Sequence, residues 1–291
     1  MLIQLLSNGI VMGCVYALVA MGFGLIYSAT GIFHFAHGIV YTSGAYLLYL
    51  LFINLKTNIL TSLFLSLAGA TLLGILIEVF IYSPLRKKEA APATYIISSL
   101  GVYIFLQNLI ALLFGNETKV IFPRVSKTYH FGSIILTRIQ VLDAIAFVIL
   151  FSIFYIFLMK TRLGKALRGL SNNALLAEVV GIDVEKTRII AFGVGSLLAG
   201  VGAALVSLDV GIDPNMGLSI FLLAAVAVIV GGVKTFTGAA LGGLFLGIIQ
   251  NMVIWKTSAR WQDLVTFSIL IMFLLFRPQG IMGKTRRLEE T

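Results

Sequence analysis

Long apolar runs, separated by short polar segments, cover almost the whole chain. A helix needs roughly 20 predominantly apolar residues to cross the hydrocarbon core of a bilayer. By this measure the sequence predicts nine candidate spans, at 2–27, 37–54, 59–82, 94–114, 139–160, 188–208, 217–233, 238–255 and 264–277. We therefore expect an all-α, polytopic integral membrane protein with eight or nine transmembrane helices.

Three of these spans are less regular than the others. The span 37–54 is short, and 217–233 is separated from 238–255 only by a glycine-rich turn. Each of the three could be a re-entrant segment or a half-helix. Non-helical backbone at membrane depth is tolerated only where it is buried in protein or lines a cavity, so such a segment would lie in the interior of the protein.

The composition agrees with a membrane protein. Hydrophobic residues make up 59% of the chain and charged residues 11%, whereas soluble domains have about 25% charged residues. Residues 1–291 contain no polar region long enough for a separate globular domain, so we expect a single transmembrane domain. The net charge of +9 could suggest nucleic acid, but the basic residues lie at the ends of apolar spans. The positive-inside rule explains that placement better, and we expect no nucleic-acid partner.

The distribution of Lys and Arg also predicts an orientation. One side collects 14 of the 21 basic residues when it holds the connection after 59–82, the segment 161–188, Lys234 and the C-terminal tail, with Lys160 and Arg277 counted on that side. This side is expected to be cytoplasmic. With nine spans in a plasma (inner) membrane, the C-terminus is then cytoplasmic and the N-terminus external. The connection 115–138 becomes the one sizeable external loop, which we expect to fold back over the outer mouth.

A polar segment of 28 residues, 161–188, interrupts the apolar pattern and reads TRLGKALRGLSNNALLAEVVGIDVEKTR. We expect Gly164 and Gly169 to break its first part. A short helix should then run from 174 to 180, capped by a preceding asparagine and ended by Gly181.

A short helix on the cytoplasmic face is suited to docking in a groove of a partner protein. The alternative is an amphipathic helix that rests on anionic lipid headgroups. Glu178, Asp183 and Glu185 place acidic groups where a lipid-binding helix would carry basic ones, which favours the protein partner. The residues predicted to form this contact are Arg162, Arg168, Ala174, Ala177, Glu178, Gly181 and Ile182.

Two histidines occur in the stretch GIFHFAHG at 31–38. Histidines three residues apart could bind a metal ion or relay protons. No nearby Cys, Asp or Glu completes a metal site, so we expect none. We interpret His34, His37 and Gly38 as part of a broken or re-entrant segment near the cytoplasmic surface.

A second glycine-rich stretch, GGVKTFTG at 231–238, predicts a tight turn between two apolar segments, with Gly231, Gly232 and Gly238 as its structural residues. A glycine–lysine pair is also found in phosphate loops. The spacing differs from that motif here, and Pro278 stands where the motif would need Gly upstream of Lys284. We therefore expect a chain that binds no ATP or other cofactor and is not an enzyme.

Polar residues inside apolar spans are costly and are therefore candidates for the lining of a transport pathway. Few of them are charged, which argues against a proton- or sodium-coupled carrier. The acidic residues Glu78, Asp143 and Asp209 lie near predicted span ends, where we expect water to reach them. Each amide could instead form an interhelical hydrogen bond. The candidates for pathway lining are Asn8, Gln107, Asn108 and Asn251.

Small residues recur at four-residue spacing, which allows two membrane helices to approach closely. They could pack helices within the chain or against a second membrane subunit. The sets are Gly9 and Gly13, Gly238 and Gly242, Gly243 and Gly247, and Ser66, Ala70 and Gly74.

Several of these stretches together resemble the permease family of bacterial ABC importers for branched-chain amino acids (the LivH-like permeases). The matching stretches follow the family's order over nearly the whole chain. They are LSNG at 6–9, GCVYAL at 13–18, FAHG at 35–38, KTRLGKALR at 160–168, AEVVGI at 177–182, the glycines at 231–243 and RPQGIMG at 277–283. His34 departs from the family's usual Asn and Gly169 from its usual Ala.

The resemblance implies one half of a membrane channel, with residues 174–182 as a coupling helix seated in an ATPase cleft. It also implies a homologous second permease (LivM-like), two cytoplasmic ATPase subunits (LivG- and LivF-like) that use ATP and Mg²⁺, and an external substrate-binding protein. Permeases for urea and short-chain amides share these stretches. From other classes, a self-sufficient carrier or channel and an integral membrane enzyme remain as alternatives.

Overall fold

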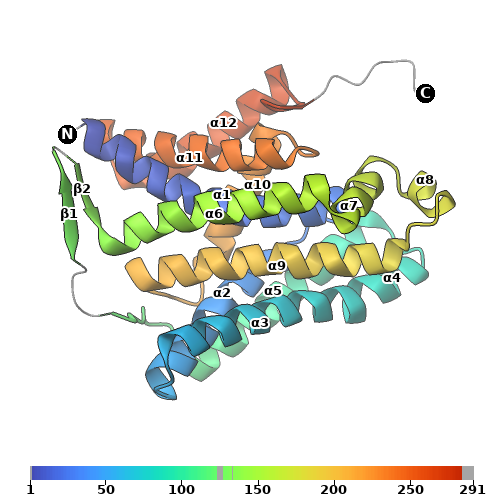
Figure 1. Ribbon diagram of the computed structural model, residues 1–291, viewed down its shortest axis with the longest axis horizontal. Helices are drawn as coiled ribbons and strands as arrows, with labels where there is room; N and C mark the ends of the chain where they lie inside the picture. Colours follow the sequence, from blue (N-terminus) through green and yellow to red (C-terminus); the bar gives the residue numbers. More distant parts are fainter. Residues whose placement is uncertain (1, 123–126, 133, 284–291) are drawn as a thin grey trace.

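The computed structural model describes residues 2–122, 127–132 and 134–283. Most helices run along one long direction of the molecule (Figure 1). One end, here the hairpin end, holds Leu2 and the two β-strands. The other end, here the α8 end, holds helices α7 and α8 and the last described residues. The predicted basic tail residues Lys284, Arg286 and Arg287 lie outside the described residues.

The apolar spans form the helices that the hydrophobic pattern predicts. The main helices are α1 (Leu2–Thr30), α2 (Ala36–Tyr49), α3 (Ile59–Ile77), α5 (Pro92–Phe114), α6 (Arg138–Lys160), α9 (Val184–Asp209), α10 (Met216–Gly231), α11 (Phe236–Lys256) and α12 (Gln262–Phe276). Shorter elements are the π-helical turns η1 (Leu50–Asn54) and η2 (Glu78–Tyr82), α4 (Ser83–Lys87), α7 (Arg162–Asn172), α8 (Ala174–Val179) and the 3-10 turn η3 (Ala259–Trp261).

Among the described residues, eight helical segments are long and apolar enough to cross a membrane. Helix α2 reaches this length together with η1, and α3 continues through η2 and α4. Helix α10 is apolar but has only 16 residues, or about 24 Å at 1.5 Å per residue, against a hydrocarbon core of about 30 Å. The expectation of an all-α protein with eight or nine transmembrane helices is confirmed: eight helical segments are long enough, and α10 is a ninth, shorter apolar helix. The protein is a multi-pass membrane protein.

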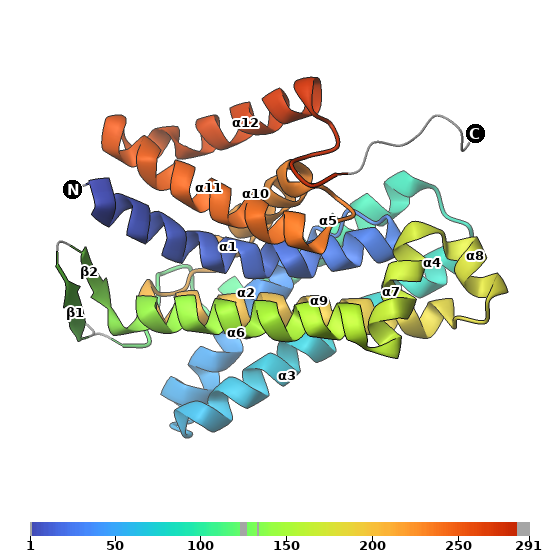
Figure 2. The ribbon, with the colours of Figure 1, turned by 45° about the horizontal axis from the view of Figure 1, so that its top comes forward.

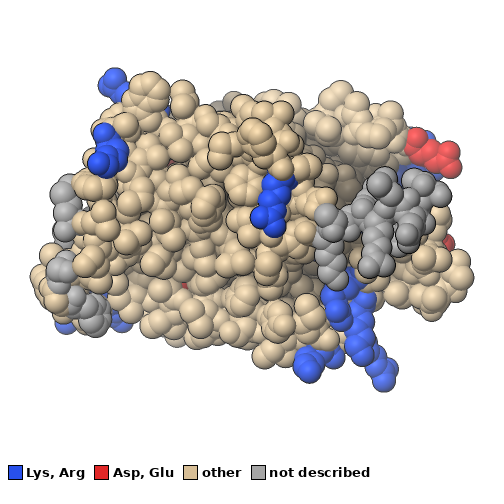
Figure 3. All heavy atoms as spheres, turned by 90° about the horizontal axis from the view of Figure 1, so that it is seen from above, with Lys and Arg blue, Asp and Glu red and all other residues tan. Residues whose placement is uncertain are grey.

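Helix α1 lies at the centre of the bundle and contacts α9, α10 and α11 (Figure 2). Its most apolar window is 89% buried, whereas those of α5 and α12 are 17% and 6% buried. Charged groups lie mainly toward the two ends, and a broad band of uncharged surface separates them (Figure 3). Side chains that face lipid do not have to be polar, so the peripheral helices have apolar side chains on their outer faces.

The close contacts of α1 are made through glycines. A Cβ atom added at Gly13 would lie 2.8 Å from the Cα of Leu244 on α11, and Gly247 of α11 lies against the backbone of Gly13. Gly74 of α3 packs in the same way on Ser196 of α9. Of the two uses predicted for the small residues, packing within the chain is the one observed at these positions.

The connection 115–138 contains a β-hairpin that the sequence did not predict. Strands β1 (Thr128–Phe131) and β2 (Ile134–Thr137) are antiparallel, with Thr128 opposite Thr137. The hairpin is joined to the start of α1, because the side chain of Gln4 both donates to and accepts from the backbone of Ile135. Pro123 and Arg124 lie outside the described residues.

Candidate functional site

The polar segment forms two helices at the α8 end. Thr161, Asn173 and Asp183 cap α7, α8 and α9, each with a side-chain oxygen that accepts a backbone N–H. Hydrogen bonds from Lys186 hold the pKa of the Asp183 carboxyl below its usual range, which keeps this cap charged. Each of the three helices that begin in this segment therefore has a capped N-terminus.

The predicted breaks at Gly164 and Gly169 are wrong, because α7 continues through both residues. Gly164 is instead a packing residue. Its Cα lies against the carbonyl oxygens of Phe157 and Leu158 at the end of α6, where a side chain would clash. The predicted stop at Gly181 is confirmed: its φ of +86° is a left-handed conformation that favours glycine.

Helix α8 presents an aliphatic surface to the surroundings. Four residues, here the α8 patch, have large exposed fractions: Leu175 76%, Leu176 62%, Val179 82% and Val180 74%. Helix α8 projects from the α8 end beyond the membrane-spanning helices (Figures 1 and 2). Contiguous exposed apolar patches of this kind mark sites of contact with proteins or membranes.

The predicted contact residues are distributed around this patch. Arg162, Arg168, Glu178 and Gly181 are exposed, Ala174 and Ile182 are half-buried, and Ala177 is buried. The two alanines therefore lie on the side of α8 that packs against the rest of the protein. The sequence analysis missed the four patch residues, although their spacing at i, i+1, i+4 and i+5 places them on one helix face.

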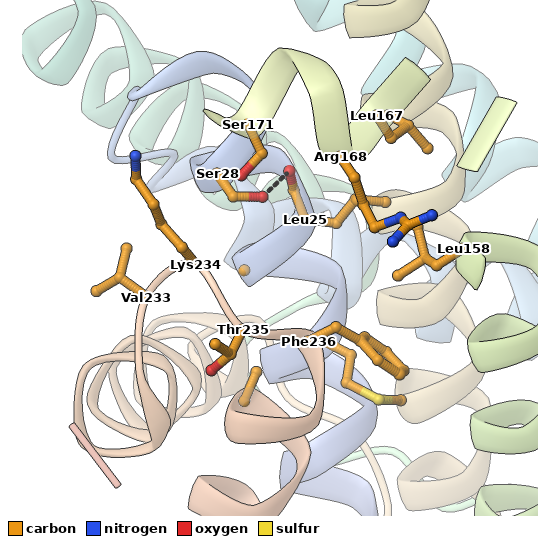
Figure 4. A pocket seen from close by; sticks show the side chains of 13 residues that line it. Leu25, Ser28, Leu158, Leu167, Arg168, Ser171, Val233, Lys234, Thr235 and Phe236 are labelled. Carbon is orange, nitrogen blue, oxygen red and sulfur yellow. Dashed lines mark hydrogen bonds between the residues drawn. The ribbon is translucent and has the colours of Figure 1, made fainter. Parts of the chain in front are cut away.

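A cavity of about 50 Å³ lies beside α7 at the α8 end. Arg168 and Lys234 stand on its two sides and point away from each other, while Leu158, Leu167 and Phe236 line it (Figure 4). Pockets that hold small molecules have volumes of about 300–1,000 Å³. This cavity is therefore too small to hold a transported solute.

The glycine-rich turn after α10 closes the same end. Gly232 has a φ of +118°, and Gly231 lies against the backbone of Gly238. The chain after α12 returns to this turn, because the N–H groups of Ile281 and Met282 donate to the carbonyls of Val230 and Gly231. The predicted structural turn is confirmed.

The histidine stretch forms a break between α1 and α2. Residues 31–35 are non-helical, and His34 and His37 are completely buried. The break reaches deeper than predicted, because His37 Nε2 lies 3.3 Å from the carbonyl oxygen of Val19. Val19 is 11 residues before the end of α1, or about 16 Å along the helix. The described residues contain no group of three potential metal ligands.

The candidate pathway residues fall in two separate places. Asn8 on α1 accepts a hydrogen bond from Gln4, and Asn251 on the adjacent α11 donates to the carbonyl of Gly247. On α5, Gln107 donates to Asn215 and Asn108 donates to the carbonyl of Ile104. The structure does not bring these four amides together. Asn108 is the only exposed one of the four.

Two of the three acidic residues are not where the sequence placed them. Glu78 is completely buried and forms an ion pair with Arg86, and Asp143 is 3% exposed. The prediction that water reaches Glu78 and Asp143 is wrong, because helix packing buries both side chains and Arg86 of α4 pairs with the former. Asp209 is exposed at the end of α9 as expected.

One buried polar cluster was missed. The hydroxyl of Tyr16 on α1 donates to Gln250 on α11 over 3.0 Å, and the amide of Gln250 donates to Thr266 on α12 over 3.1 Å. Gln250 looked like one of many amides in the sequence. Only the packing of three helices shows that it joins them.

Comparison with known proteins identifies the family. The profile of the family described as "Branched-chain amino acid transport system / permease component" matches residues 5–274. The chain is 31% identical to the high-affinity branched-chain amino acid transport system permease protein BraD of Pseudomonas aeruginosa, over 97% of this chain and 96% of that protein. It is also 31% identical to LivH of Escherichia coli K12, over the same fractions of the two chains.

An archaeal relative and a solved structure extend the comparison. A probable branched-chain amino acid transport permease protein LivH of Methanocaldococcus jannaschii is 28% identical over 99% of this chain and 96% of that protein. The solved structure of PsaBC from Streptococcus pneumoniae in complex with Fab matches 94% of this chain and 92% of its own with a TM-score of 0.50. At 14% identity this likeness concerns the fold alone. With a full-length family match and 31% identity to its members, the chain belongs to the permease family of branched-chain amino acid ABC transport systems.

Proposed function

We propose that this chain is the membrane-spanning permease subunit of an ATP-driven importer and forms half of the pathway for branched-chain, hydrophobic amino acids. The substrate class follows from the names of the relatives. The observation that carries the coupling role is the α8 patch, since a permease driven by a separate ATPase needs a docking surface outside the membrane.

The proposed assembly has four kinds of partner. A homologous second permease supplies the other half of the pathway, two cytoplasmic ATPase subunits bind the α8 end with ATP and Mg²⁺, and a substrate-binding protein docks at the hairpin end. The small cavity beside α7 supports a pathway between two permeases. The exposed Asn108 on α5 supports the same view, because an amide that faces lipid is costly.

The proposed orientation places the α8 end in the cytoplasm and the hairpin end outside. The start of α1 lies at the hairpin, whereas the residues after α12 return to the glycine-rich turn beside the cavity next to α7. In this orientation movement of the ATPase subunits acts on α8. It reaches the bundle through α7, which ends next to α8, and through α9, which begins next to it.

The experiment replaces one patch residue by a charge. Val179→Asp should prevent the ATPase subunits from co-purifying with the permease and lower ATP-dependent leucine uptake by at least tenfold, because an aspartate cannot be buried in an apolar groove without a partner. The matched control is Val210→Asp, an exposed valine between α9 and α10. Equal retention of the ATPase subunits by the two variants would contradict the proposed role of α8.

A further inference from the structure

We propose that the hydrogen bond between His34 and Tyr82 is a pivot that transmits movement of α8 to the short helices α2 and α10. The inference rests on the proposed function and adds two positioning residues to it. Neither residue contacts solute, because both side chains are completely buried. They act by holding the break that separates α1 from α2.

The break is held by side chains of other helices in addition to its own short-range hydrogen bonds. His34 Nδ1 lies 2.8 Å from the Tyr82 hydroxyl, which follows α3. The N–H of Ala36, in the first turn of α2, donates to the Ser99 hydroxyl of α5 over 2.9 Å. A non-helical segment that is bonded to other elements moves when those elements move, whereas a regular helix would resist such a displacement.

Tyr82 reaches the break from an irregular piece of helix. It is the last residue of the π-helical turn η2, and such turns occur frequently at functional sites. Glu78, at the start of the same turn, is anchored by its ion pair with Arg86. The turn is therefore fixed at one end while its other end carries the tyrosine to His34.

Helix α9 connects this pair to the coupling segment. The Phe192 ring lies 5.0 Å from the His34 ring and 5.5 Å from the Tyr82 ring, measured between centroids. Phe192 is eight residues into α9, or about 12 Å from its start. The N–H groups of Gly181 and Ile182 donate to the carbonyls of Glu178 and Ala177, so α8 and the start of α9 are joined by a short hydrogen-bonded turn.

On its other side the break contacts α10. The rings of Phe33 and Phe35 lie 5.5 and 5.0 Å from the Phe221 ring of α10. Gly38 and Gly217, in the first turns of α2 and α10, have their backbones in direct contact. A shift of the break would therefore displace both short helices together.

The histidines also leave room for a second arrangement. His34 Nε2 and His37 Nδ1 are buried and have no hydrogen-bond partner among the described residues. Buried polar atoms are rarely left unpaired in a native protein. An arrangement that pairs these nitrogens would compete with the one observed, as a two-state element requires.

The test measures coupling in the complete importer reconstituted in proteoliposomes, with its binding protein and leucine. Tyr82→Phe removes only the hydroxyl. We expect a normally assembled complex in which the number of ATP molecules hydrolysed per leucine imported rises at least fivefold. His34→Gln keeps a side chain that can bond to Tyr82, and its ratio should lie closer to that of the wild type than the ratio of His34→Ala.

The matched control is Tyr46→Phe, because the Tyr46 hydroxyl on α2 is also buried and has no partner among the described residues. Its ratio should equal that of the wild type. A Tyr82→Phe ratio within twofold of the wild type would overturn the pivot, as would equal losses of uptake and hydrolysis. A wild-type complex without ATP-driven uptake would instead overturn the proposed function, and the pivot with it.

Discussion

Burial of single charged residues costs more folding free energy than any other feature of the bundle. Glu78 has a side chain that is 1% exposed, and its ion pair with Arg86 offsets part of the free energy lost when the carboxylate leaves water. Lys87 and Glu185 form a second pair nearby at 3.9 Å, with side chains 68% and 62% exposed. The two pairs link neighbouring segments but differ in burial, which makes them a natural comparison.

Glu78→Gln should lower the free energy of unfolding by about 3 kcal/mol, because Arg86 keeps its charge without a buried partner. Glu185→Gln, the control, should cost at most about 1 kcal/mol. Denaturant unfolding of the detergent-purified permease measures both values. Equal effects of the two substitutions would show that Glu78 is neutral in the folded protein.

At the scale of whole helices, glycines allow some pairs to approach to backbone contact. Helices α1 and α11 approach so closely that Gly247 lies against the backbone of Gly13. Lipid gives membrane helices no hydrophobic drive to associate, so close backbone approach and van der Waals contact supply much of the stability.

Gly247→Leu should separate α1 from α11 and lower the free energy of unfolding by about 3 kcal/mol, the upper range for overpacking. Gly101→Leu on α5 is the control, since nothing lies within 4 Å of a Cβ added there. Both substitutions raise helix propensity equally, so the difference in thermal unfolding midpoint reports packing alone. A midpoint for Gly247→Leu equal to that of the control would contradict the close contact.

The whole molecule has two chemically different ends. The α8 end carries the polar helices and the α8 patch, and the hairpin end carries the β-strands tied to Leu2–Thr30 through Gln4. Because helices of membrane-spanning length run between them, these two ends face opposite sides of the membrane.

Cysteine labelling tests this orientation. Cys14 is the single cysteine of the chain and is 4% exposed, so the native background should be low. A membrane-impermeant maleimide should label Glu117→Cys in intact cells and Glu178→Cys only after the inner membrane is permeabilised. Labelling of Glu178→Cys in intact cells would reverse the proposed orientation.

Much of the fold could be predicted from the sequence because each helix carries its own signal. Apolar length predicted the spans, and the left-handed stop at Gly181 follows from local backbone preference. The hairpin at 128–137 was missed, since its pairing depends on contacts with α1 that no short stretch encodes. Gly164 was misread as a helix break for a similar reason. Glycine is favoured both where a helix ends and where two backbone segments come into contact, and the sequence does not distinguish the two.

The sequence by itself determined a multi-pass membrane protein with one long polar segment at 161–188, because apolar length and composition are local properties of the chain. The permease family was indicated by the resemblance of its motifs and shown by the family match. Only the tertiary structure decided which side chains of that segment are exposed and which are buried. Ala177 and Val179 are two residues apart, yet one is 3% and the other 82% exposed. It also decided that His34 meets Tyr82 and Phe192, which come from the break, η2 and α9 and lie far apart in the sequence. Burial and contact depend on how helices pack against one another, and that information is spread over the whole chain.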